Sequence, residues 1–235
     1  MPVLLLAQGD SASKDLLRKA IEARYGTRPP ALDSLKIRFN GRSRVKVGPV
    51  TTWIPLDITA YFKFPTALRW DFVAKPLKLP VQRGIEAYDG VTYRTTRGGK
   101  EPTIIVDGQQ VSSLRRRLWA VASVMLTPLS DFNVKVESTS DYSLRATNTK
   151  LGDFAEIVLR EDYSVDYVQV MCLNPDTNQN ENHILRVSEE LVTIDDLLLP
   201  AKLCSFWNDK PDSELEAVSA QSNPNLTDAI FRIED

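Results

Sequence analysis

The stretch that decides the fold is LDITAYFKFPTALRWDFVA, Leu56–Ala74. Every second residue of its first half is apolar, up to Phe64, and the same period resumes at Leu68 and runs to the end of the stretch. A period of two is typical of a strand with one buried face, and the Pro65-Thr66 step between the halves is typical of a turn. The stretch therefore predicts two antiparallel strands joined by a tight turn.

The same period of two recurs from Asp33 to the last third of the chain. Asp89-Gly90 separates two such segments and is a strong hairpin signal, and the polar stretch 174–182 separates two more. A sheet of this size made of sequential hairpins has to curl to bury its apolar face. We expect an α+β fold that is mainly antiparallel β: a curved, unclosed β-barrel of about ten strands with an N-terminal helix and an inserted lid helix.

The N-terminal helix is predicted from KDLLRKAIEARY, where apolar residues recur at helical spacing. Ser13 precedes this segment and is expected to cap the helix, and Gly26 is expected to end it. Residues 13–235 contain no linker or repeat, so we expect a single domain. Residues 1–12 are expected to be a flexible terminus or the remnant of an export signal, because Ala7 and Gly9 are small residues at the spacing that signal peptidases prefer.

The second helix is predicted from SSLRRRLWAVASVMLTPL, Ser112–Leu129, which is too short to span a bilayer. We expect it to lie as a lid on the concave face of the sheet, with its apolar stripe inward. Together with inward aromatic residues of the sheet, that stripe supplies the candidate ligand-binding residues: Phe62, Trp70, Phe72, Leu114, Leu118, Val121, Ala122 and Met125. The arginines Arg115, Arg116 and Arg117 are expected at the mouth, where they would meet an anionic head group. The alternative is a plain core helix with solvated arginines.

The net charge of −2 hides two opposite halves. Residues 1–120 hold 21 Lys+Arg against 10 Asp+Glu, and residues 121–235 hold 8 against 21. The positive charges are spread singly through alternating segments rather than clustered, which disfavours nucleic-acid binding. We expect the two halves to attract each other within one fold.

Residues that carry out catalysis or bind metals are sparse. His183 is the only histidine and stands in a polar segment, so we expect it to face solvent from a strand. Cys172 and Cys204 lack the spacing of a metal site. We expect them to be buried free thiols, with a disulfide between them as the alternative. We therefore expect no metal, no cofactor and no enzymatic activity, with an enzyme of unrecognised type as the remote alternative.

Four motifs together resemble the periplasmic lipoprotein-carrier superfamily, the LolA-like and LppX-like proteins. They occur in the family's order, and they are KFPTALRW at Lys63–Trp70, YDGVTY at Tyr88–Tyr93, DDLLLP at Asp195–Pro200 and NPNLTDAIF at Asn223–Phe231. The resemblance implies an unclosed antiparallel barrel, with helices across its mouth and an apolar interior that receives acyl chains. In some carriers an arginine before the turn proline latches the lid, and here Phe64 occupies that position.

The function expected from the resemblance and the composition is that of an exported binding protein. It would shield a lipid or a lipoprotein acyl chain in the concave face of the sheet, in the periplasm or otherwise outside the cytoplasm. We expect a monomer that makes at most peripheral contact with a membrane or a membrane protein. The alternative is a non-catalytic structural or interaction module of the same fold with a filled interior.

Overall fold

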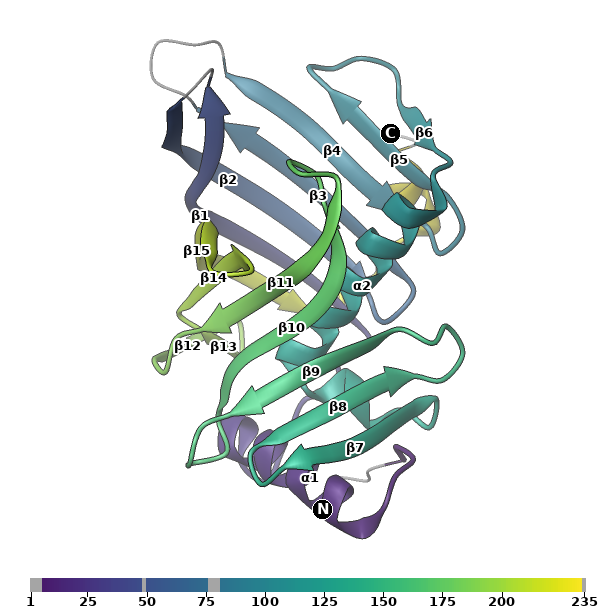
Figure 1. The fold of residues 1–235 in the computed structure, drawn as a ribbon, viewed down its shortest axis with the longest axis vertical. Coiled ribbons are helices and arrows are strands. Elements are labelled where there is room, and N and C mark those ends of the chain that lie inside the picture. Colours follow the sequence, from purple (N-terminus) through teal and green to yellow (C-terminus); the bar gives the residue numbers. More distant parts are fainter. Residues whose placement is uncertain (1–5, 48–49, 76–80, 234–235) are drawn as a thin grey trace.

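The computed structural model describes residues 6–47, 50–75 and 81–233. Within these ranges, two α-helices accompany one curved antiparallel sheet of 13 strands and a separate two-stranded ribbon (Figure 1). The large sheet has the order β6-β5-β4-β3-β2-β1-β15-β14-β11-β10-β9-β8-β7, so its two edges are β6 and β7 and it does not close. The expected α+β class and unclosed, barrel-like sheet are confirmed.

The bounds of the elements, in chain order, are α1 (Ser11–Tyr25), β1 (Ser34–Val47), β2 (Val50–Lys63), β3 (Ala67–Ala74), β4 (Gln82–Tyr88), β5 (Tyr93–Arg97), β6 (Thr103–Ile105), α2 (Gly108–Met125), the 3₁₀ helix η1 (Thr127–Ser130), β7 (Val134–Ser140), β8 (Ser143–Asn148), β9 (Phe154–Leu159), β10 (Val165–Asn174), β11 (Gln179–Val187), β12 (Leu191–Ile194), β13 (Leu197–Pro200), β14 (Lys202–Trp207), β15 (Lys210–Ser222) and the 3₁₀ helix η2 (Asp228–Arg232).

The first and last long strands, β1 and β15, pair at the centre of the sheet. This pairing joins the basic half of the chain to the acidic half, as the charge pattern predicts. Arg42 on β1 lies 2.7 Å from Glu214 on β15, and Lys63 at the end of β2 lies 3.1 Å from Asp228 of η2. These four side chains are about half exposed or more, so each pair contributes only a few tenths of a kcal/mol to about 1 kcal/mol.

The curved sheet has two arms, one formed by the strands from β6 to β1 and the other by the strands from β15 to β7. Helix α2 lies between these arms and packs against β9, β10 and β11 (Figure 1). It contributes to both buried apolar clusters of the protein: Trp119 and Ala122 belong to one, and Leu114, Leu118 and Met125 belong to the other. The helix therefore forms part of the core as well as covering the concave face. No helix in the described ranges is long and apolar enough to cross a membrane.

The predicted start of this helix, near Ser112, was wrong by about one turn. Asp107 is the N-cap, and its Oδ1 accepts hydrogen bonds from the backbone N–H groups of Gln109 and Gln110. The reason is physical: an aspartate directly before the first turn can accept hydrogen bonds from its free N–H groups, whereas Ser112 already lies inside the helix. The helix ends at Met125, and the predicted remainder forms η1.

The predicted cap of helix α1 was also wrong. The helix begins at Ser11 and is capped by Asp10, whose Oδ1 accepts from the Ser13 N–H at 2.7 Å. The Ser13 hydroxyl instead accepts a hydrogen bond from the Ser138 N–H of β7 at 2.8 Å. At the other end, the Arg24 guanidinium and the Tyr25 hydroxyl donate to the Val124 and Met125 carbonyls, which α2 leaves unpaired at its C-terminus. Helix α1 thus holds the end of α2 in place.

The segment before α1 was expected to be a flexible terminus or an export-signal remnant. Residues 1–5 of it lie outside the described residues. In the described part, Ala7 is buried, and the Gln8 N–H and carbonyl both make backbone hydrogen bonds to Val134 and Val136 of β7. This segment covers the outer edge of the sheet.

Candidate ligand-binding cavity

A cavity of about 390 Å³ lies between the two arms of the sheet. Its lining comes from strands on both sides of the central β1–β15 pair, with β1 to β5 on one side and β11, β14 and β15 on the other, and from α2 and β13. Most of its lining is apolar: Leu35, Ile37, Phe39, Val45, Ile54, Leu56, Ile58, Phe62, Trp70, Phe72, Ala74, Val121, Val124, Met125, Leu185, Leu199, Pro200, Leu203, Leu215 and Ala217. A volume of this size is at the lower end of the range of small-molecule sites, about 300 to 1,000 Å³.

The structure divides the predicted ligand-binding residues into two groups. Phe62, Trp70, Phe72, Val121 and Met125 line the cavity. The other three, Leu114, Leu118 and Ala122, are fully buried in the apolar clusters and lie away from the cavity. The predicted stripe of α2 is therefore mostly core packing, and the cavity lies along one side of it.

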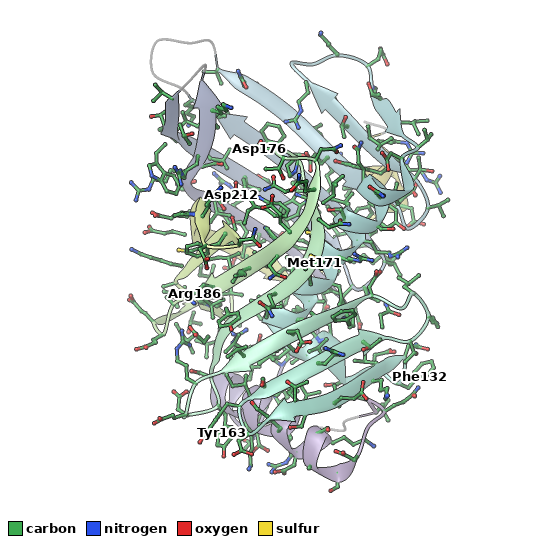
Figure 2. All side chains as sticks on the ribbon, viewed as in Figure 1. Phe132, Tyr163, Met171, Asp176, Arg186 and Asp212 are labelled. Atoms are coloured by element: carbon green, nitrogen blue, oxygen red, sulfur yellow. The ribbon has the colours of Figure 1, made fainter. Side chains whose placement is uncertain are left out.

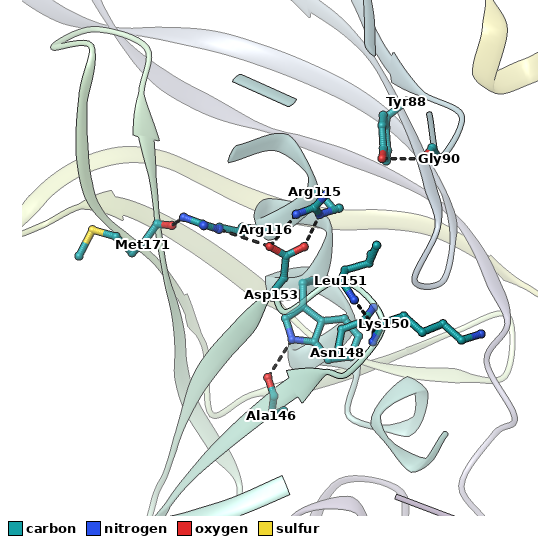
Figure 3. A network of polar contacts seen from close by, with 11 residues as sticks. Tyr88, Gly90, Arg115, Arg116, Ala146, Asn148, Lys150, Leu151, Asp153 and Met171 are labelled. Atoms are coloured by element: carbon teal, nitrogen blue, oxygen red, sulfur yellow. Dashed lines mark hydrogen bonds and ion pairs between the residues drawn. The ribbon is translucent and has the colours of Figure 1, made fainter. Parts of the chain in front are cut away.

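The three arginines of α2 are separated as well, because successive residues of a helix are rotated by about 100°. Arg115 and Arg116 both turn toward Asp153, the residue before β9, and Arg116 also donates from Nη1 to the Met171 carbonyl at 2.9 Å (Figure 3). Asp153 is only 4% exposed and its two oxygens are occupied by these guanidinium groups. Arg115 and Arg116 do not line the cavity, in contrast to the expectation that all three arginines stand at its mouth.

Arg117 does line the cavity. Its Nη2 lies 3.6 Å from Glu86 Oε2 on β4, and Glu86 Oε1 also accepts from Arg97 Nη2 at 3.3 Å. The side chains of Arg97, Arg117 and Glu86 are 63%, 25% and 19% exposed, so Arg97 is the most solvated of the three. The guanidinium of Arg97 also lies over the Phe72 ring, 4.7 Å from its centroid. Charged groups thus form one wall of an otherwise apolar cavity.

His183 was expected to face solvent, and this prediction was wrong. It is 7% exposed, lines the cavity from β11 and packs against the Trp207 ring with centroids 4.6 Å apart. Burial, together with the positive charge of Arg117, lowers the pKa of His183 to about 3. The alternation of side chains along the strand could have predicted this burial. His183 is two residues before Leu185 and therefore shares its inward face, whereas Arg186, the residue after Leu185, points outward (Figure 2).

Asp212 is the second carboxylate in the lining, at the start of β15 (Figure 2). Its Oδ2 accepts a hydrogen bond from the Ser205 hydroxyl at 2.9 Å, and Ser205 also contacts the Ser213 hydroxyl at 2.6 Å. Burial raises the pKa of Asp212, and the Ser205 hydrogen bond and the charge of Arg117 oppose that rise. Sequence reasoning missed this group because Asp212 stands in a turn-like stretch that reads as solvated.

Four buried side-chain nitrogens and oxygens lack a hydrogen-bond partner among the residues that the structure describes. Three of them, Trp70 Nε1, Arg117 Nε and His183 Nδ1, belong to side chains that line this cavity. Buried polar groups are usually paired, so this concentration of unpaired groups at one place is unusual for a filled core.

The two cysteines are free thiols, with Cys172 buried and Cys204 partly buried. Across residues 6–47, 50–75 and 81–233, no group of three or more His, Cys, Asp or Glu side chains is placed to hold a metal ion. The described part of the chain therefore offers the apolar cavity as its candidate site.

No family model and no curated protein matches the sequence. Among solved structures, the chain is similar to a LolA superfamily protein from Nitrosomonas europaea, with a TM-score of 0.52 and 14% identity over 93% of this chain and 96% of that one. The chain has a LolA-like fold. Two other similar structures, each with a TM-score of 0.48, are a DUF1329 family protein from Desulfovibrio piger and a domain from Vibrio parahaemolyticus named for outer membrane lipoprotein sorting. They share 12% and 9% identity, over 94% and 95% of this chain and 95% and 98% of theirs.

The motifs that carry the resemblance occupy turns of the LolA-like fold. They form the β2–β3 turn, the β4–β5 hairpin, the β12–β13 turn and the passage from β15 to η2. Phe64, which stands where some carriers have a latching arginine, stacks on Phe62 with ring centroids 5.6 Å apart. Phe62 lines the cavity, so Phe64 packs beside one of its wall residues.

Proposed function

We propose that this protein is an exported carrier or sensor that holds one acyl chain of a lipid or lipoprotein in the cavity between the arms of its sheet. The observation that carries the proposal is the apolar cavity itself, which persists although Trp70, Phe72 and four residues of α2 line it. A structural module with a filled interior, the alternative from the sequence, would place these large side chains in contact across the same space. The volume near the lower end of the ligand-site range favours a single chain over several.

The proposal involves no covalent chemistry. Asp212 and His183 in the cavity lining have clearly shifted pKa values, which is a feature of catalytic residues: burial raises the pKa of Asp212, and the pKa of His183 is lowered to about 3. A general base is most effective with a pKa near the working pH, and His183 is too weak a base at neutral pH. Its depressed pKa follows from burial, which fits a wall residue of a binding site.

The proposed location, the periplasm or another exported compartment, rests on the LolA-like fold and on the names of the similar structures. An apolar cavity on a protein with a charged exterior suits transfer of a hydrophobic cargo through water, because the cargo is shielded while the outer face stays hydrated. The Vibrio domain is named for lipoprotein sorting, and for this chain lipoprotein is one of two cargo classes, with free lipid as the other.

A direct test is displacement of a neutral fluorescent apolar probe by fatty acids of increasing length, with delipidated protein. We expect saturable one-to-one binding that strengthens with chain length. The variant Ala217→Phe adds a ring to a residue that lines the cavity and should weaken binding about tenfold or more. Val218→Phe changes the neighbouring exposed residue and is the matched control, with binding expected to be unchanged.

Native mass spectrometry of the purified protein gives a second readout, because a carrier retains part of its cargo. Absence of probe and fatty-acid binding would contradict the proposal and favour the structural module. Equal binding by wild type and Ala217→Phe would also contradict it, because the bound chain would then lie elsewhere.

A further inference from the structure

Arg117 differs from its two neighbours in the Arg115–Arg117 triplet. Arg115 and Arg116 share Asp153, and Arg116 reaches the Met171 carbonyl as well. In the described part of the chain, Arg117 has one ionic contact, at 3.6 Å from Glu86, and its Nε is buried without a partner. A guanidinium carries five N–H donors, so most of the hydrogen-bonding capacity of Arg117 is unused.

Burying a guanidinium with unused donors lowers the stability of the folded protein unless a hydrogen-bond acceptor is supplied. The Arg117 side chain is three-quarters buried, and a buried charge is normally paired and hydrogen-bonded. The side chains that line the cavity with it are mostly apolar and offer few acceptors. A ligand with an acceptor group at its end would provide what the protein lacks, and the two other partnerless nitrogens, on Trp70 and His183, belong to the same lining.

The sign of that acceptor group follows from the charges that face the cavity. These are the cations Arg97 and Arg117 and the carboxylates Glu86 and Asp212, with His183 neutral. Glu86 has a second partner in Arg97, so it stays paired when Arg117 turns away from it. Asp212 has its hydrogen bond from Ser205 and a pKa raised by burial, so it takes up a proton more readily than a solvated aspartate. Arg117 is therefore the group that can gain an anionic partner.

We propose that Arg117 binds the anionic head group of the cargo, a carboxylate or a phosphate, inside the cavity, while the acyl chain lies along the apolar walls. This inference rests on the proposed function and names its ligand class: a single-chain anionic amphiphile. Arg117 forms charge-assisted hydrogen bonds to the head group in place of its long contact with Glu86, and Arg97 holds Glu86 meanwhile. Arg115 and Arg116 fasten the helix and take no part in binding.

The test compares three ligands with the same C18 chain: oleate, oleyl phosphate and oleyl alcohol, each displacing a neutral fluorescent probe at pH 8. Wild-type protein should bind at least one anionic ligand about tenfold or more tightly than the alcohol, as expected for a hydrogen bond to a charged group. In Arg117→Gln this preference should disappear with alcohol affinity unchanged. In the matched control Arg116→Gln the preference should remain. The tighter of oleate and oleyl phosphate identifies the source as a fatty acid or a phosphate-bearing lipid.

A second variant, Glu86→Gln, tests the head-group assignment even if Arg117→Gln fails to fold. Glu86→Gln removes the internal competitor for Arg117 and should strengthen binding of the anionic ligands relative to the alcohol. Equal affinity of wild type for all three ligands, retention of the preference in Arg117→Gln, or an unchanged preference in Glu86→Gln would each overturn the head-group assignment and leave the acyl-chain proposal standing. Failure of all three ligands to bind would overturn the proposed function itself.

Discussion

Arg115 donates a hydrogen bond from Nη2 to Asp153 Oδ1 at 3.1 Å and so fixes the middle of α2 to the residue that precedes β9. One turn further along, Trp119 Nε1 donates to the Ala146 carbonyl of β8 at 2.9 Å, on the same side of the helix. These two bonds set the rotation of α2 about its axis. That rotation places Arg117 and Val121 on the side of the helix that lines the cavity.

Replacement of Asp153 by asparagine should lower the free energy of unfolding by about 1 to 3 kcal/mol, because it removes the negative charge that two partly buried guanidinium groups share. Urea denaturation measures the loss. Glu137→Gln is the control, since its partner Lys135 is half exposed, and it should change stability by less than about 0.5 kcal/mol. Equal losses in the two variants would show that the Asp153 contacts do not hold the helix.

Gly84 on β4 explains how Phe72 comes to lie in the cavity wall. A Cβ at position 84 would stand 2.3 Å from Phe72 Cζ and 2.9 Å from the Thr96 carbonyl oxygen. Gly84→Ala should therefore displace the Phe72 ring and cost about 1 to 3 kcal/mol, the usual range for overpacking. Gly108→Ala, where a Cβ meets nothing within 4 Å, is the matched control and should be close to neutral.

The displaced Phe72 ring gives the same variant a second readout. Because Phe72 lines the cavity, Gly84→Ala should also weaken acyl-chain binding, whereas Gly108→Ala should not. Thermal unfolding and probe displacement on the two proteins decide both points. A stable Gly84→Ala protein with unchanged binding would mean that the ring moves away from the cavity.

Most of the fold was predictable because alternation of apolar residues reports directly on a sheet with one buried face. About ten strands were expected, against 13 in the large sheet and two in the ribbon of the described residues, and the alternation is weakest in short or polar strands. In β7 (Val134–Ser140) only Val134 and Val136 are buried and the other five residues are polar, and β6 and β12 have only three and four residues. The Asp195-Asp196 pair of the DDLLLP motif is the turn between β12 and β13, with both residues at positive φ.

The site was less predictable, because the fate of a polar side chain depends on partners far away in sequence. Arg115, Arg116 and Arg117 are identical residues, and what separates them is Asp153, 38 positions after Arg115. Similarly, the polar residues before His183 hid the fact that it shares the inward face of its strand with Leu185. Periodicity predicts which positions face inward, but it cannot predict which inward polar groups are satisfied.

The junction between the basic and acidic halves of the chain predicts a dependence on salt. In a double-mutant cycle of Arg42→Gln and Glu214→Gln, we expect a coupling of about 0.2 to 1 kcal/mol at low salt, because the pair is roughly half exposed. The coupling should fall toward zero as ionic strength approaches 1 M, where the screening length is only about 3 Å. Urea denaturation of the four proteins at two salt concentrations measures it. A coupling that is insensitive to salt would assign the effect to packing, for example of Arg42 on the Trp53 ring.

His183 predicts how stability depends on pH. Its pKa is about 3 in the folded protein, against 6.5 for an unperturbed histidine. Well above pH 6.5 the imidazole is neutral in both states and contributes no pH dependence. As the pH falls from 6.5 toward 3, the unfolded chain binds a proton that the folded chain does not, so the free energy of unfolding falls, with a slope that approaches about 1.4 kcal/mol per pH unit.

Because His183 is the only histidine, a slope measured between pH 5 and pH 6.5 is separated from the titration of ordinary carboxylates. His183→Leu should remove most of that slope, since leucine fills the place beside Trp207 without a titrating group. The raised pKa of Asp212 acts with the opposite sign and is present in both proteins, so it cancels in the comparison. Urea denaturation at pH 7, 6 and 5 gives the two slopes. If wild type and His183→Leu lose stability equally over this range, then His183 is protonated in the folded protein and the cavity is more hydrated than its geometry indicates.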